Sequence, residues 1–128
     1  MDVSPFADAD PDDLREPLTV TARLTEDRAA LAARLERLSE DMSALVAASR
    51  DSNADDEHDP EGQTIAYERS QLAAVTRQAE SHLAEVEAAL VRVAEGTYGV
   101  CDICHENIAA ERLASRPTAR TCVHHVPR

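Results

Sequence analysis

The last 28 residues of the chain contain all three of its cysteines and three of its five histidines. Cys101 and Cys104 are separated by two residues, and Cys122 follows after 17 more. His125 stands at the same two-residue spacing from Cys122. Zinc takes four nitrogen or sulfur ligands in a tetrahedron, and a two-residue spacer lets both members of a pair bind one ion. The pattern C-x2-C-x17-C-x2-H therefore predicts a closed, structural Zn²⁺ site. The predicted ligands are Cys101, Cys104, Cys122 and His125.

Two other histidines are alternatives for the fourth ligand. His124 precedes His125, and His105 follows Cys104 directly. We prefer His125 because it repeats the spacing of the first pair. Three thiolates and one neutral imidazole give the site about one negative charge. Arginines at 112, 116 and 120 are close enough in sequence to offset it.

The sequence offers little that would serve an enzyme. A catalytic zinc keeps an open coordination position, whereas four ligands are available here. There is no recognisable nucleophile with its base and no phosphate-binding loop. We therefore expect a protein without catalytic turnover.

The composition favours long helices and a protein partner. The chain has 128 residues, a net charge of -12 and 2% aromatic residues, and all 13 basic residues are Arg. Few bulky residues and many Ala, Leu, Arg and Glu indicate helices rather than a large core. Strong acidity argues against direct DNA or RNA binding and against an anionic membrane surface.

The absence of targeting segments from the sequence and the number of cysteines indicate the same cellular compartment. No run of 18 apolar residues is present, and the acidic N-terminus has no apolar segment of the kind a signal peptide needs. We expect a cytoplasmic protein, where thiols stay reduced and an odd cysteine count suits a metal. Residues 1–17 contain Pro5, Pro11 and Pro17 among acidic residues and are predicted to form a flexible tail.

Two heptad stripes follow the tail and predict a pair of packed helices. The first, from about 18 to 50, consists of Leu24, Leu31, Leu35, Leu38, Met42 and Leu45, with Arg28 as a charged interruption. The second, from about 64 to 95, consists of Ile65, Leu72, Ala79, Val86 and Val93. Matched stripes joined by a short polar segment fold back as an antiparallel hairpin.

The ends of the second helix carry their own signals. Asp59-Pro60-Glu61 has the composition of a helix start, with Asp as the cap and Pro at the first position. Because Gly62 weakens this turn, Thr64 is an alternative start. Gly96 and Gly99 predict its end.

The predicted fold is mainly α, an antiparallel coiled-coil helical hairpin plus a small zinc-finger globule. The hairpin covers residues 18–95 with an acidic tip near 51–63, and the finger covers 96–128.

The stretches "GTYGVCDIC" and "ERLASRPTARTC" resemble the DksA/TraR family of zinc-finger transcription factors. The resemblance is close over about 93–125 and extends in plan to about 20–125. It implies a helical hairpin on a zinc globule. It also implies a regulator that binds RNA polymerase and inserts an acidic tip into the secondary channel. The family carries four cysteines, and this chain has His125 at the fourth place.

The resemblance also implies a D-x-x-D-x-A tip. Counting back from Cys101 places His58, Glu61 and Gln63 at its positions, and a second register places Asp56, Asp59 and Glu61 there. The predicted polymerase-active residues are Asp56, Asp59 and Glu61.

Some family members respond to guanosine tetraphosphate through basic residues. Arg116 matches one of these positions, whereas Glu85 stands where a Lys is expected. We therefore expect a weak or absent response to this nucleotide.

A second interpretation from another class stays open. The chain is then a zinc-stabilised coiled-coil interaction module that does not act on RNA polymerase. An intramolecular hairpin predicts a monomer, whereas pairing of the same heptads between chains predicts a dimer. Light scattering separates these two states.

Overall fold

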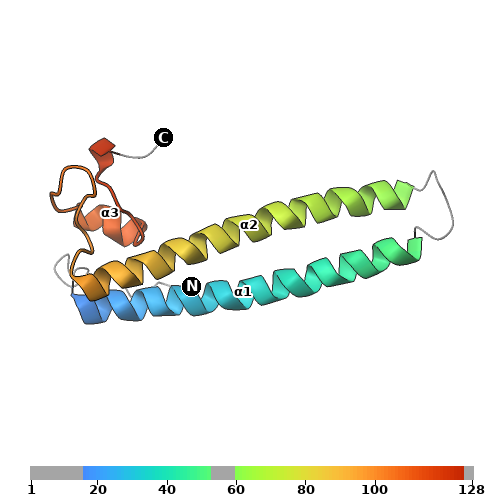
Figure 1. The fold of residues 1–128 in the computed structure, drawn as a ribbon, viewed down its shortest axis with the longest axis horizontal. Helices are drawn as coiled ribbons and strands as arrows, with labels where there is room; N and C mark the ends of the chain where they lie inside the picture. Colours follow the sequence, from blue (N-terminus) through green and yellow to red (C-terminus); the bar gives the residue numbers. More distant parts are fainter. Residues whose placement is uncertain (1–15, 53–59, 126–128) are drawn as a thin grey trace. The chain divides into compact units, whose positions relative to one another are not determined.

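The computed structural model of this chain describes residues 16–52 and 60–125. Its elements in chain order are α1 (Pro17–Ser52), α2 (Pro60–Glu95), α3 (Ala110–Ser115) and the 3₁₀ helix η2 (Val123–His125). Within the described residues the extended pairing consists of one isolated antiparallel bridge, between Val100 and Asn107. The predicted mainly helical fold is confirmed, and α1 and α2 pack as a hairpin (Figure 1).

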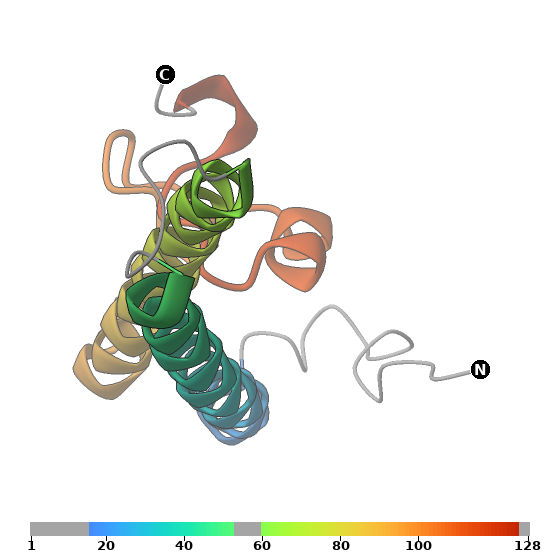
Figure 2. The same cartoon turned by 90° about the vertical axis from the view of Figure 1, so that its right-hand side faces the viewer.

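The chain divides into two compact units. One contains the residues up to Arg28 together with those from Ala84 onward, and the other contains Ala29–Leu83. Within each unit, a segment of α1 lies beside a segment of α2, as the two perpendicular views show (Figures 1 and 2). The first unit also holds the predicted zinc finger, and the second holds the remainder of the hairpin.

The heptad stripes form the contact between the two helices. In the first unit Leu24 and Val86 are fully buried. In the second unit Leu31 and Ala79 are buried as well. Arg28, which interrupts the stripe, is exposed and keeps its charge in water. The two predicted stripes therefore pack against each other, because apolar side chains at this spacing share one face of each helix.

The helix ends lie close to their predicted positions. α2 begins at Pro60, the first of the two expected starts, because proline fits the first helical turn, where no N–H is needed. Pro17, assigned to the tail by the sequence, begins α1 for the same reason. Asp56 and Asp59 lie outside the described residues, and Glu61 is described only as part of the α2 backbone.

Candidate metal centre

The turn after α2 redirects the chain into the finger. Gly96 has a φ of +78°, in the left-handed region that favours glycine. The N–H of Gly96 donates to the carbonyl of Val93 at 3.2 Å, and the N–H of Thr97 donates to that of Arg92 at 2.9 Å. These two bonds are those of a Schellman cap. The predicted end of α2 thus lies at Gly96, and Gly99 belongs to the next turn.

The first cysteine pair lies in a short loop that an antiparallel bridge closes. Val100 and Asn107 form its antiparallel bridge, and the N–H of Cys101 donates to the carbonyl of Glu106 at 2.8 Å. These contacts bring the two ends of the Cys101–Glu106 segment together. The segment between them must therefore turn sharply.

That turn orients the sulfur of Cys101. The N–H of His105 donates to the carbonyl of Cys101 at 3.0 Å, and the N–H of Ile103 lies 3.4 Å from the Cys101 sulfur. His105 has a φ of +62°, which is unusual for a residue other than glycine. The C-x2-C spacing folds back because one residue accepts this left-handed conformation.

The second pair is arranged by η2. The N–H of His125 donates to the carbonyl of Cys122 at 3.1 Å, which closes one short turn. This turn places Nδ1 of His125 3.1 Å from the Cys122 sulfur. His124, between them in sequence, is exposed.

The two pairs meet at one point. One ligand atom from each of Cys101, Cys104, Cys122 and His125 lies within 4.8 Å of the others. The sulfurs of Cys104 and Cys122 are 3.9 Å apart, and the Cys101 sulfur is 3.9 Å from Nδ1 of His125. All three cysteines are free thiols.

These spacings suit a tetrahedral ion. With zinc–sulfur bonds of about 2.3 Å, the edge of such a tetrahedron is about 3.8 Å. Three thiols and one imidazole are also a donor set that zinc takes in structural sites. The residues therefore fit the Zn²⁺ that the sequence predicts. His105 and His124 are not part of this group.

Two of the thiols differ in acidity. The N–H of Cys104 bonds to the sulfur of Cys101 and is the main cause that lowers the pKa of the Cys101 thiol to about 6. For Cys104, the N–H of Glu106 is the largest single influence and acts to lower the pKa. Burial and the neighbouring sulfurs outweigh it, so the pKa of the Cys104 thiol is raised. Because the thiolate binds metal, Cys101 is the better-prepared ligand at neutral pH.

A small apolar core supports the candidate metal centre. Cys101, Ile108 and Leu113 are buried, and the half-buried Tyr98 and Ala119 pack against them. The core is too small to hold a fold of this size alone, so a metal crosslink would carry much of the finger's stability.

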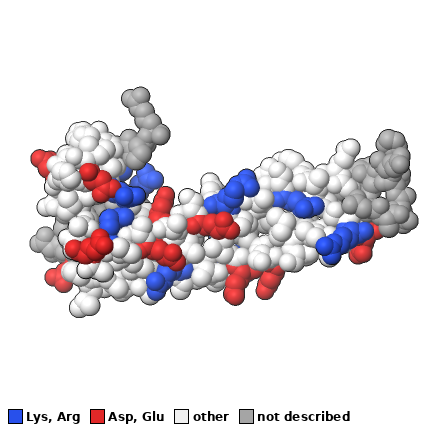
Figure 3. All heavy atoms as spheres, in the orientation of Figure 1, with Lys and Arg blue, Asp and Glu red and all other residues white. Residues whose placement is uncertain are grey.

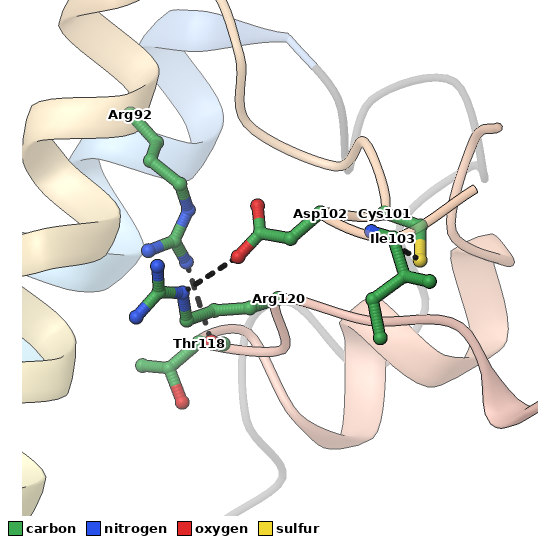
Figure 4. Close-up of polar contacts among 6 residues, drawn as sticks. All are labelled: Arg92, Cys101, Asp102, Ile103, Thr118 and Arg120. Carbon is green, nitrogen blue, oxygen red and sulfur yellow. Dashed lines mark hydrogen bonds and ion pairs between the residues drawn. The ribbon is translucent and has the colours of Figure 1, made fainter. Parts of the chain in front are cut away.

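Arginines from both long helices hold the finger, one through α3 and the other through the loop that leads to Cys122. Arg23 of α1 donates to the carbonyl of Ala114 at 2.6 Å, and Arg92 of α2 donates to the carbonyl of Thr118 at 3.3 Å (Figure 4). Burial, together with the nearby Arg120, lowers the pKa of Arg92. No sequence pattern marks Arg23 or Arg92, because their acceptors are main-chain oxygens that any residue supplies.

Two further side chains fix the same loop from within the finger. The hydroxyl of Tyr98 donates to the carbonyl of Pro117 at 2.7 Å. Arg112, on α3, donates to the carbonyl of Thr121, next to Cys122, at 2.8 Å. The backbone that carries Cys122 is therefore held by hydrogen bonds as well as by any metal.

Arg120 pairs with the turn between Cys101 and Cys104 rather than with the sulfurs. Its guanidinium lies 3.0 Å from the carboxylate of Asp102 (Figure 4), and the N–H of Asp102 donates to the Arg120 carbonyl at 2.9 Å. Of the three arginines expected to offset the site's charge, Arg120 and Arg112 thus have acceptors elsewhere. Arg116 is exposed.

The finger matches a known family. Residues 96–124 match the model described as "Prokaryotic dksA/traR C4-type zinc finger". This segment is a dksA/traR zinc finger. The match is to a C4-type finger and ends at His124, one residue before His125.

Two further likenesses extend the comparison beyond the dksA/traR finger. The chain is 36% identical over 69 residues to YteA of Bacillus subtilis (strain 168), described as uncharacterized. That match covers 54% of this chain, which spans 29% of the length of YteA. The structure of transcription factor DksA2 from Pseudomonas aeruginosa superposes with a TM-score of 0.69 and 24% identity, over 97% of this chain and 85% of that chain. This likeness shows that the two share a fold.

Among the described residues, no helix combines the length and the apolar character needed to cross a membrane.

Proposed function

We propose that this chain is a transcription regulator that binds RNA polymerase directly and inserts its hairpin into the secondary channel. The observation that carries the proposal is the combination of a dksA/traR finger at 96–124 with a hairpin fold like that of the transcription factor DksA2. A shared fold alone does not fix a function. The family-specific finger on that fold is what favours this one.

The charge of the chain supports the same partner. The net charge is -12, and the segment joining the two long helices is rich in carboxylates. A cavity lined by basic groups attracts such a tip and orients its approach. In this proposal Asp56, Asp59 and Glu61 act on the polymerase, and the chain itself catalyses no reaction.

In the same proposal, Cys101, Cys104, Cys122 and His125 hold a structural Zn²⁺. When bound, the ion crosslinks the two knuckles and neutralises most of the thiolate charge. The two long helices add to this, because Arg23 of α1 bonds to α3 and Arg92 of α2 bonds to the loop before Cys122. The chain then works as a cytoplasmic monomer without reading DNA bases.

Transcription by purified polymerase tests the tip. The variant with Asp56→Asn, Asp59→Asn and Glu61→Gln should lose its effect on promoter complexes and still bind polymerase. The matched control changes three exposed helix carboxylates, Glu36→Gln, Glu40→Gln and Glu80→Gln, and should regulate as the wild type does. Normal regulation by the tip variant would show that these residues do not act on the polymerase.

The second candidate is the zinc-stabilised interaction module with another protein partner. It is favoured by the same heptads and finger, which need no polymerase to form. Two results together would establish this alternative. The wild-type chain would bind no core RNA polymerase, and the wild type and the tip variant would bind another protein equally well.

A further inference from the structure

The apolar stripe of the long helices is incompletely covered in the second unit. Leu24 and Val86, in the first unit, are fully buried. The stripe residues that follow Leu31 toward the end of α1, and those that precede Ala79 on α2, are only half-buried. They are Leu35, Leu38, Met42, Leu45, Ile65 and Leu72. Water therefore reaches apolar surface that the hairpin could not close, and covering it would be favourable.

A cleft opens along this incompletely covered part of the stripe. It lies within the second unit and has a volume of about 560 Å³. Leu45, from α1, and Leu72 and Val75, from α2, are among its walls. Ala44 adds only a methyl group to the lining, and Tyr67, 66% exposed, stands on the rim. Tyrosine in such a position is a frequent anchor in protein interfaces, since its ring buries large apolar area.

The charges in the lining are all of one sign. Asp41 of α1 and Glu68 of α2 border the cleft, and none of its described lining residues is basic. Elsewhere on the helices both signs occur, as the face in Figure 3 shows. A second copy of this chain would bring the same two carboxylates and a net charge of -12 to the contact, so self-association there is disfavoured.

We propose that this cleft is a docking surface for a protein segment with an apolar side chain flanked by Lys or Arg. The apolar side chain enters between Leu45 and Leu72, and the basic groups meet Asp41 and Glu68. The inference rests on the proposed function, in which the partner carrying this segment is RNA polymerase. It adds an attachment point on the hairpin's side, separate from the acidic residues at its tip.

The test compares the affinity of core RNA polymerase for full-length, zinc-loaded variants. Tyr67→Ala should weaken binding about tenfold, as loss of an interface anchor does. The control is Val91→Ala, which shortens another exposed apolar residue of the same helix and should bind as the wild type does. A photo-crosslinking amino acid at position 67 should join the chain to a polymerase peptide that contains Lys or Arg.

The charged rim has its own variant. Asp41→Asn with Glu68→Gln should weaken binding about threefold and reduce its dependence on salt, since two attractive charges are lost. Both residues are exposed, so the fold should tolerate the change. Equal helical content and zinc content of all variants show that the comparison concerns binding alone.

The outcomes separate this inference from the function it rests on. If wild type and Tyr67→Ala bind polymerase equally well, the docking surface is wrong and the proposed function stands. If the wild type does not bind polymerase, both fail. If light scattering shows a dimer that Tyr67→Ala converts to a monomer, a second copy occupies the cleft, and the inference is overturned.

Discussion

Arg23, on α1, donates a 2.6 Å hydrogen bond from Nη2 to the carbonyl oxygen of Ala114, which lies 91 residues later in the finger. The bond links the first turns of α1 to α3, the helix that precedes the loop carrying Cys122. Arg92 makes the equivalent link from α2 to Thr118. The finger is thus held by both helices of the hairpin through main-chain oxygens.

Arg23→Ala should lower the free energy of unfolding by about 1–2 kcal/mol, because it removes a charge-assisted hydrogen bond and leaves a half-buried carbonyl without this donor. Chemical denaturation of the zinc-loaded protein measures the loss. The control is Arg28→Ala, an exposed arginine five residues further along α1, which should change stability by less than about 0.5 kcal/mol. Equal effects of the two substitutions would mean that the Ala114 contact contributes nothing.

His125→Ala should weaken zinc binding by at least about 100-fold, since losing a ligand exceeds the effect of losing a residue that only supports one. His124→Ala should leave the affinity nearly unchanged, because the His124 side chain is exposed and outside the ligand group. His125→Cys should bind zinc tightly, because it restores the four-cysteine set. Competition with a chromogenic chelator measures all three, and a larger loss in His124→Ala would exchange the two assignments.

His105→Gly should raise the stability of the zinc-loaded finger by about 1 kcal/mol, because glycine adopts the φ of +62° without the strain that a side chain causes. His105→Val should lower it, since a β-branched residue resists this conformation most. Thermal melting of the two variants measures the difference. Loss of zinc from His105→Gly would instead show that His105 is a ligand.

Removing zinc should unfold the finger and leave most of the helical signal. The finger's buried core is Cys101, Ile108 and Leu113, whereas structural zinc supplies on the order of 10–16 kcal/mol of apparent folding energy. α1 and α2 have 36 residues each, against six in α3, so circular dichroism should fall only slightly on chelation. Amide exchange should become fast over residues 97–125. Slow exchange there without metal would mean that the finger folds unaided.

The hairpin could be predicted because its packing repeats. Leu24 and Val86 lie on heptad stripes, and both are fully buried as that spacing requires. Both ends of α2 could be predicted as well, since Pro60 begins the helix and Gly96 caps it with a positive φ. The metal site was predictable for a similar reason, because the C-x2-C and C-x2-H spacings are set by the size of the ion.

Other features of the finger and the hairpin could not be predicted, because they depend on contacts that no sequence pattern indicates. Arg23 and Arg92 bond to main-chain oxygens, so their partners could be any residue. His105 occupies a left-handed conformation that is usual for glycine, so the histidine in the sequence does not indicate it. The cleft beside Tyr67 arises from incomplete packing of a stripe that reads as continuous. Asp56 and Asp59 stay predictions, because they lie outside the described residues.

Direct binding of the zinc-loaded chain to core RNA polymerase tests whether this chain acts on that enzyme. Surface-immobilised polymerase should bind the wild-type chain reversibly, with one chain per enzyme. The affinity should fall when chelation unfolds the finger or when Arg23→Ala and Arg92→Ala are combined. Absence of binding by the folded, zinc-loaded wild type, or binding that survives complete loss of the finger's structure, would contradict the account.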